Sequence, residues 1–275
     1  MYKSITITYM SRKLNKHFST PRRKYLLKKD EPDKRDFLFQ AEKLQVDNVV
    51  LPASFDLRSK LPPILDQGQL GTCAANQISN ALRYCLKKNN CPEFQPSRLF
   101  LYYFARLVDG SSVQEDTGIT IRSGLKSVQQ YGVCGENNWG YDITKFTEEP
   151  NNKCIVAGQS HTPNFKYIRV QQNLINIKQA IFAGFPVVVG IQLYTTFESD
   201  PVAQTGTVPM PNFSKEACLG GHAINLNAWD DKTQRFTCAN SWSDSWGDKG
   251  YFTLPYEYIL NSSLCSDLWI VTYFK

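Results

Sequence analysis

Residues 67–78 read QGQLGTCAANQI, a glycine-containing loop that ends at Cys73 and is followed at once by a helical pattern. Apolar residues recur at three- and four-residue spacing after Cys73, which predicts that this cysteine lies in the first turn of a helix. The unpaired N–H groups and the positive dipole end of a helix N-terminus favour an anion and lower a cysteine pKa. The stretch therefore predicts either a nucleophilic Cys73 or, as for most cysteines, a buried inert thiol.

The overall composition is that of a globular chain. Its 275 residues are 42% apolar and 13% aromatic, enough for one or two hydrophobic cores. No apolar run is long enough to span a bilayer, and no apolar core of a secretory signal follows the basic N-terminal residues. We therefore expect an intracellular protein or, if the chain is viral, a virion protein, whose eight cysteines stay thiols. The alternative under oxidation is pairing of Cys85 with Cys91, or of Cys134 with Cys154.

The first fifty residues differ from the rest. They hold 12 Lys or Arg against 6 Asp or Glu, whereas residues 51–275 hold 19 of each. Ile5, Ile7 and Tyr9 alternate with polar residues, which predicts a short strand. The apolar residues between Phe37 and Val46 are expected to pack against another part of the protein. Two interpretations stand: a partly disordered basic tail, or a propeptide that lies over the body and is later removed. Since the body has no net charge, we expect no specific nucleic-acid partner and no membrane partner.

From Leu51 the chain reads as a folded body in two halves. Helices are predicted from Cys73 to about residue 89, from Ser97 to residue 110, from about Ile119 to residue 132, and before Gly184. Residues 140–167 read as a loop-rich connection. Strands are predicted at residues 187–193, 222–229, 235–239 and 250–254. A helical lobe over about 51–140 and a strand-rich lobe over about 160–265 predict an α+β protein with a cleft between them.

Of the three histidines, only His222 has an informative context. It follows two glycines and starts an apolar strand, whereas His17 and His161 lie in polar or loop-rich stretches. The turn signal at residues 230–233 predicts a hairpin, and the midpoint between His222 and Asn240 is residue 231, in that turn. Asn240 is therefore expected beside His222, where its amide can fix the imidazole and leave the other nitrogen toward Cys73. The alternative is a structural histidine at the end of a strand, with its hydrogen bonds satisfied and no catalytic role.

Three segments resemble the papain-like cysteine peptidases, in the form typical of microbial and viral members and related to cathepsins. They are the run Gln67–Cys73, the run Gly220–Ala223 and the run Asn240–Trp242. The order Cys, His, Asn is that of the family, and spacings of 149 and then 18 residues fit it. The resemblance covers most of residues 51–270. It departs from the family at Leu70, where many members have a disulfide cysteine, and in lacking the pattern of a long helical prodomain.

The resemblance implies a role for each catalytic position. Cys73 is the expected nucleophile, held as a thiolate beside protonated His222. Asn240 is expected to orient His222. The side chain of Gln67 and the backbone N–H of Cys73 are expected to donate hydrogen bonds to the oxyanion. Peptide-bond hydrolysis through a thioester follows from these roles.

The resemblance also implies substrate-binding positions. Trp242 is expected to shield the His–Asn pair from water, and Gly118 to let a peptide backbone lie along the cleft wall. Asp267 lies near the position that lines the second specificity pocket, where an acid favours a basic side chain. The alternative for Asp267 is a surface or salt-bridged carboxylate.

The implied function is a cysteine-type endopeptidase, made as a zymogen masked by its N-terminal extension, residues 1–50. Its expected partners are a protein or peptide substrate and its own N-terminal segment. The alternatives are a non-catalytic binding or structural protein that keeps the fold, and a transglutaminase-like acyl transferase, which commonly has Asp in place of Asn240. No insertion with paired histidines, as in cathepsin B, is present to block the cleft. With scattered histidines and no CxxC pair, we expect no metal and no cofactor.

Overall fold

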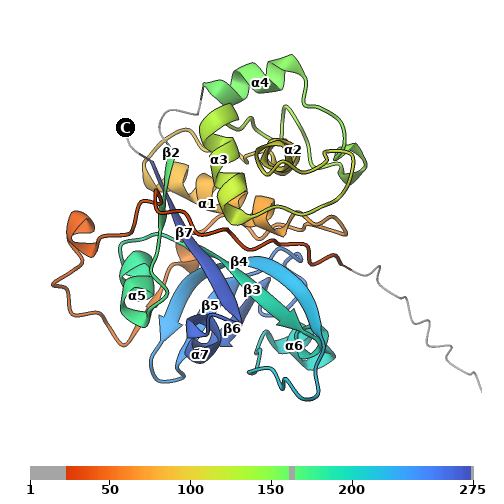
Figure 1. Ribbon diagram of the computed structural model, residues 1–275. Helices are drawn as coiled ribbons and strands as arrows, with labels where there is room; N and C mark the ends of the chain where they lie inside the picture. The colour runs from red at the N-terminus through yellow and green to blue at the C-terminus, as the bar shows by residue number, and fades with distance from the viewer. Residues whose placement is uncertain (1–22, 161–164, 274–275) are drawn as a thin grey trace, which may run out of the picture.

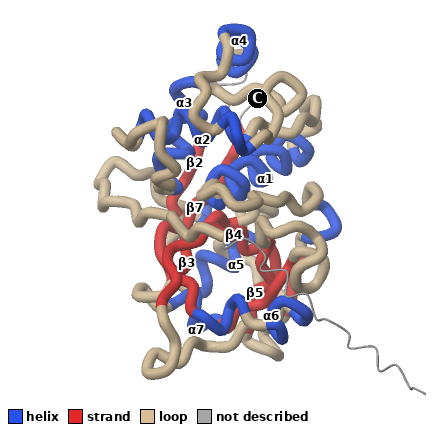
Figure 2. The backbone as a smooth tube through the Cα atoms, turned by 90° about the vertical axis from the view of Figure 1, so that its right-hand side faces the viewer, coloured by secondary structure: helices blue, strands red, loops and turns tan. Residues whose placement is uncertain are grey.

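The computed structural model describes residues 23–160 and 165–273, which form two lobes (Figures 1 and 2). One lobe is helical and consists of α1 (Cys73–Lys88), α2 (Arg98–Val108), α3 (Ile121–Tyr131) and α4 (Asn152–Gln159). The side chain of Ser97 caps α2, and Thr120 caps α3 in a capping box with Ser123. Because Thr120 is the cap, α3 starts slightly later than the sequence predicted. None of the helices in these residues is long and apolar enough to cross a membrane.

The second lobe is built on an antiparallel sheet with the strand order β2-β7-β3-β4-β5-β6. Its strands are β2 (Phe165–Arg169), β3 (Val187–Tyr194), β4 (Cys218–Asp230), β5 (Arg235–Ala239), β6 (Tyr251–Pro255) and β7 (Cys265–Tyr273), and β1 (Ser54–Asp56) pairs with β4. The helices of this lobe are α5 (Leu174–Phe182), α6 (Asp200–Thr205) and α7 (Tyr256–Leu260). Helices beside an antiparallel sheet confirm the predicted α+β class.

Each lobe has its own hydrophobic core. The sheet-lobe core includes Trp229, Phe236 and Ile259, and the helical-lobe core includes Ile78 and Phe100. The helical-lobe core also takes in Val188, Ala223 and Trp269 from β3, β4 and β7. The helix that begins at Cys73 therefore packs directly against the strand that carries His222.

Three details of the sequence-based prediction were wrong. The stretch 140–167 is not only a loop, because it contains α4 and the start of β2; in α4 only Cys154 and Gly158 are buried, so its apolar periodicity is weak. Strand β7, next to the middle of the sheet, was not predicted. In the β4–β5 hairpin Asn225 pairs with Ala239 and Leu226 with Cys238, so the hairpin is centred later than residue 231.

The N-terminal segment, residues 23–50, first crosses the body between the two lobes and then runs along the sheet lobe beside α5 (Figure 1). Phe39, Ala41 and Val46 are buried in the sheet-lobe core, whereas Phe37 and Leu38 are exposed. Leu44 is partly buried and packs against the same core, so the packing predicted for this apolar stretch is present at four of its positions. The predicted strand at residues 5–9, together with His17 and His161, lies outside the described residues.

Candidate active site

Cys73 is the first residue of α1 and is almost completely buried. The backbone N–H of Ala223 on β4, the residue that follows His222, lies close enough to the thiol to favour its thiolate form. Two segments that are far apart in the sequence thus meet at the sulfur, one from each lobe. The contact arises because the N-terminus of α1 packs on the face of the sheet that presents β4.

The imidazole of His222 is held by one hydrogen bond, 2.8 Å from Nε2 to Oδ1 of Asn240. That oxygen also accepts from the backbone N–H of Ser241 at 2.8 Å, so it is the acceptor and His222 Nε2–H is the donor. The other ring nitrogen, Nδ1, has no hydrogen-bond partner within residues 23–160 and 165–273. This tautomer leaves the Nδ1 lone pair available to take a proton. The side chains of His222 and Asn240 meet although their residues are not paired in the hairpin.

The electrostatics of the site are dominated by burial. Burial raises the pKa of the Cys73 thiol to about 11, although the N–H groups of Ala223 and Ala74 favour the thiolate. Burial also lowers the pKa of His222 to about 4, against the opposite effect of the Asn240 bond and with a smaller contribution from the Arg23 charge. With the N-terminal segment in place, both shifts favour the neutral thiol and the neutral imidazole.

Gln67 is fully buried and links the loop before α1 to the segment after β5. Its Oε1 accepts from Ser241 Oγ at 2.7 Å, and its Nε2 donates to the carbonyl oxygen of Leu70 at 3.1 Å. Its backbone N–H donates to the carbonyl oxygen of Ser241 at 2.9 Å, and its carbonyl oxygen accepts from Tyr141 Oη. The amide is thus oriented with its oxygen toward Ser241 and its nitrogen on the side of the Cys73 loop.

Trp242 lies over the imidazole, with its ring centroid 5.2 Å from that of His222. Phe197 and Trp246 pack on the indole at 5.4 and 4.9 Å, and all three aromatic side chains are buried. This aromatic cluster covers the His222–Asn240 hydrogen bond on the sheet-lobe side.

The N-terminal segment covers the site from the other side, in a groove whose walls are Gly71, Asp116 and Gly118 on the helical lobe and Gly221 and Trp242 on the sheet lobe. The backbone N–H of Leu27 donates to Gly221 at 3.1 Å, and that of Lys28 donates to Ile119 at 3.2 Å. A Cβ atom on Gly118, whose φ is +64°, would lie only 1.8 Å from the carbonyl oxygen of Leu26. Gly118 therefore does lie against a peptide backbone, that of the chain's own segment.

Aromatic and cationic side chains of the segment fill the groove beside His222. The ring of Tyr25 is 6.1 Å from that of His222 and 6.0 Å from that of Trp242, measured between centroids. The guanidinium of Arg23 lies 4.6 Å from the centre of the Trp242 ring. The side chains of Arg23 and Tyr25 thus occupy the space beside the imidazole and the Trp242 indole.

Asp267 is buried at the end of the groove and is engaged on both oxygens. Oδ1 accepts from Arg169 Nη2 at 3.2 Å, and Oδ2 accepts from the backbone N–H of Asp30 at 3.0 Å. The carboxylate of Asp30 in turn accepts from Trp269 Nε1 and from the backbone N–H of Arg122. Asp267 is thus the salt-bridged residue that was the alternative, and it anchors the segment.

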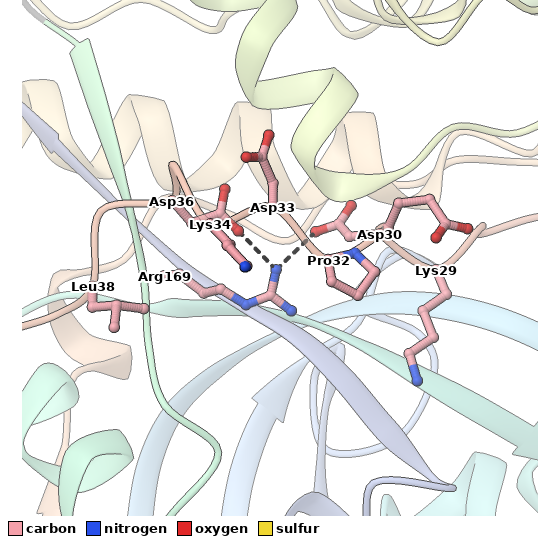
Figure 3. A pocket seen from close by; sticks show the side chains of 9 residues that line it. Lys29, Asp30, Pro32, Asp33, Lys34, Asp36, Leu38 and Arg169 are labelled. Carbon is pink, nitrogen blue, oxygen red and sulfur yellow. Dashed lines mark hydrogen bonds and ion pairs between the residues drawn. The ribbon is translucent and has the colours of Figure 1, made fainter.

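Arg169 also pairs with Asp36 at 3.2 Å and lies 3.9 Å from Asp30, as the dashed lines in Figure 3 show. The cavity beside this anchor has a volume of about 630 Å³. Apart from Arg169, all of its lining residues belong to the N-terminal segment, so the cavity exists only while the segment is docked.

Sequence reasoning assigned no role to Ser241, Tyr141, Asp116 or Tyr25. Ser241 lies inside the quoted Asn240–Trp242 motif and Asp116 lies two residues before Gly118, but their contacts to Gln67 and to Gly71 depend on how the loops fold. All eight cysteines lie in described residues and are free thiols. Within residues 23–160 and 165–273, no three His, Cys, Asp or Glu side chains come together as a group that could hold a metal ion.

Known proteins place this chain in a family. The sequence model of the papain family cysteine proteases matches residues 51–266. An uncharacterized peptidase C1-like protein of Acanthamoeba polyphaga mimivirus is 37% identical over 276 residues, covering 92% of this chain and 88% of that protein. A cathepsin B-like cysteine proteinase of Schistosoma japonicum is 26% identical over 247 residues, covering 75% of this chain and 69% of that protein.

Solved structures agree with the sequence relatives. The crystal structure of xylellain, a cysteine protease from Xylella fastidiosa, superposes with a TM-score of 0.83 at 32% identity, over 93% of this chain and 99% of that one. Digestive procathepsin L 3 of Tenebrio molitor shares the fold, with a TM-score of 0.63 at 18% identity over 82% of this chain and 72% of that one. These findings confirm the predicted resemblance: the chain belongs to the papain family of cysteine proteases.

Proposed function

We propose that this chain is a cysteine endopeptidase that hydrolyses peptide bonds through a thioester acyl-enzyme. The observation that carries the proposal is that Cys73 packs in one buried cluster with Ala223, the neighbour of His222, whose ring is fixed by Asn240 with Nδ1 unbonded. A nucleophile, a base and a group that orients the base are thereby brought together from α1, β4 and the end of β5.

Each residue has a defined step in this proposal. His222 Nδ1 takes the proton of the Cys73 thiol, and the thiolate attacks the peptide carbonyl. The Gln67 amide N–H and the Cys73 backbone N–H stabilise the oxyanion. The imidazolium gives its proton to the leaving amine as the C–N bond breaks, which leaves a thioester. His222 then takes a proton from water, whose oxygen attacks the thioester, and returns it to the departing sulfur.

An endopeptidase fits the course of the N-terminal segment. Arg23 and Tyr25 lie on the Trp242 side of the site, and Lys28 and Asp30 lie on the side that leads to Asp267. The groove thus holds a polypeptide that continues in both directions past the pair. An exopeptidase needs a barrier on one side, and residues 23–30, the described part of the segment in the groove, meet none.

The same segment is proposed to keep the enzyme inactive as a zymogen. In this proposal residues 51–275 are the peptidase domain and residues 1–50 are the inhibitory extension. The segment excludes substrate sterically, because Leu26 touches Gly118 and Tyr25 lies against His222. It also contributes to the burial that keeps Cys73 and His222 uncharged, so its removal is expected to restore the thiolate–imidazolium pair. The procathepsin structures that share this fold are likewise precursor forms.

The proposal is tested by cutting the segment after the chain has folded. Lys34 and Arg35 form an exposed turn, so a recognition sequence for a specific protease can be inserted between them. The cut releases residues 1–34 with the groove contacts and retains Phe39, Ala41 and Val46 in the core. Uncut and cut protein are then compared with a fluorogenic peptide and with an epoxide thiol inhibitor.

We expect turnover and labelling of Cys73 in the cut protein, little of either in the uncut protein, and none in Cys73→Ala. No turnover and no labelling after cutting would favour the non-catalytic alternative. Equal turnover before and after cutting would reject the masking role and leave the peptidase in place. An added amine acceptor distinguishes hydrolysis from acyl transfer by the product formed.

A further inference from the structure

The N-terminal segment lies in the groove as an extended chain with two faces. Odd-numbered side chains contact the sheet lobe and even-numbered side chains contact the helical lobe, the former being Arg23, Tyr25 and Leu27 and the latter Lys24, Leu26 and Lys28. This period of two is the geometry of an extended peptide. The contacts of the segment therefore show which chemistry each wall of the groove accepts.

The helical-lobe wall accepts basic side chains at two positions. Lys24 Nζ lies 2.9 Å from Asp116 Oδ2, and Lys28 Nζ lies 3.0 Å from Asp109 Oδ2. Both carboxylates are well covered, with side-chain exposures of 5% for Asp116 and 15% for Asp109, whereas both lysines are more open. The acids are thus fixed parts of the wall, and the lysines are the parts that leave with the segment.

Asp116 is held beside the nucleophile before any ligand arrives. Its carboxylate accepts from the backbone N–H of Gly71 at 3.1 Å and from Tyr102 Oη at 2.6 Å. Tyr102 Oη accepts in turn from the backbone N–H of Gly118. Gly71 precedes Cys73 by two residues, so a side chain that reaches Asp116 belongs to a residue bound next to the sulfur.

We propose that Asp116, with Asp109 further along the same wall, selects basic side chains, so that the substrates are polypeptides with Lys or Arg next to the scissile bond. This proposal depends on the proposed peptidase function. In it, the side chains of a substrate contact the helical-lobe wall where Lys24 and Lys28 of the segment now lie. Once Lys24 leaves, Asp116 keeps two neutral donors as its direct partners, and the nearby Arg106 guanidinium donates its hydrogen bonds to carbonyl oxygens instead. A cationic substrate side chain replaces the lost ion pair, and a neutral one leaves the carboxylate without a directly bonded cation.

The other acid near the groove does not compete for this role. Asp267 already has the Arg169 guanidinium at 3.2 Å, so its charge is compensated after the segment has left. The acid expected from the sequence to favour basic substrates is therefore satisfied within the protein. Asp116 lies on the opposite lobe beside the Cys73 loop, and within the described residues its ion pair is with Lys24 of the segment.

The test uses the full chain, folded intact and then cut between Lys34 and Arg35. A fluorogenic peptide with glutamine at every position is compared with peptides that carry one lysine each, scanned along both sides of the scissile bond. The enzymes are the unmodified chain, Asp116→Asn, Asp109→Asn and the control Glu115→Gln. Glu115 is an exposed acid adjacent to Asp116, so the control removes the same charge without the contact.

We expect lysine at one position next to the scissile bond to raise kcat/KM about tenfold over glutamine. The ratio of kcat/KM for the lysine peptide to kcat/KM for the glutamine peptide should fall to about two or less in Asp116→Asn and should be unchanged in Glu115→Gln. In the unmodified chain this ratio should decrease with added salt. Lysine at a second position should lose its advantage in Asp109→Asn. If Asp116→Asn fails to fold, the salt dependence and the Asp109→Asn result still decide the question.

The outcomes separate the two proposals. Hydrolysis of all peptides at the same rate, or a preference for lysine that survives in Asp116→Asn, overturns the selection and leaves the peptidase. Absence of hydrolysis and of Cys73 labelling with every peptide overturns the peptidase itself. In that case the affinity of the cut Cys73→Ala protein for the lysine and glutamine peptides still measures the selection: equal affinities overturn it.

Discussion

Gly118→Ala should release the N-terminal segment without touching the catalytic residues. The added Cβ would lie 1.8 Å from the carbonyl oxygen of Leu26 and 2.6 Å from its carbonyl carbon. The segment backbone must move by more than about 1 Å to reach van der Waals contact. Such a shift breaks the hydrogen bonds of Leu27 to Gly221 and of Lys28 to Ile119. Each of these two hydrogen bonds contributes about 1 kcal/mol, so their loss weakens the free energy of docking by about 2 kcal/mol. The population of molecules with an open groove then rises about 30-fold.

The assay is the rate at which iodoacetamide labels Cys73 in the uncut protein, followed by peptide mapping because Cys218 is exposed and also reacts. Gly110→Ala is the matched control, since Gly110 has φ +68° and open space around its position for a Cβ. Both variants carry the same left-handed backbone strain, and only one meets the segment. Equal labelling rates in the two variants would refute the idea that the segment controls access to Cys73.

Three further predictions concern the site and its anchor. Gln67→Ala removes a proposed oxyanion donor, so kcat/KM of the cut protein should fall by about 10²-fold, and a change below about threefold would remove Gln67 from the mechanism. Asn240→Ala removes the 2.8 Å bond to His222 Nε2, and kcat should fall about tenfold or more, with an altered pH profile as the sign of a positioning role. Burial, and then the Asp267 charge, raise the pKa of Asp30 from 3.8 to about 6 when it is docked. The docked form then binds the proton more tightly, so this group strengthens docking fully below pH 3.8 and loses the effect as pH rises through 6. Between pH 6 and 4, the affinity of the cut fragment should therefore rise by about 30-fold, and Asp30→Asn should flatten that rise.

The parts of the site that sequence could predict are those with a local signal. Cys73 follows a glycine loop and starts an amphipathic helix, so its place at a helix N-terminus could be read directly. His222 and Asn240 lie close to one turn, and a hairpin brings them together even with an error in its register. The error arose at the turn itself: Asp230 pairs with Arg235, so the strands are joined by residues 231–234 and the hairpin is centred later than residue 231. The irregularity between Leu226 and Ala228 shifts the register by one residue in the opposite direction and does not remove the difference.

The remainder depends on contacts between distant segments. The path of the N-terminal segment is set by hydrogen bonds and ion pairs to both lobes, such as Lys24 with Asp116 and Asp30 with Asp267, which are more than 90 residues apart in sequence. The net charge of residues 1–50 shows that they are basic, but it does not distinguish a free tail from an extended segment docked in the groove. For the same reason the salt bridge of Asp267 with Arg169 stayed one of two alternatives until β7 and β2 were seen to lie side by side.

The measurement that tests the central claim most directly is the pH dependence of Cys73 alkylation before and after the segment is cut. In the uncut protein, alkylation should rise only at high pH, because burial holds the pKa of the thiol near 11. In the cut protein, the account predicts a plateau of fast alkylation that extends well below pH 7 and is lost in His222→Ala. A cut protein whose Cys73 titrates as an ordinary thiol near pH 8.5, with or without His222, would contradict the account.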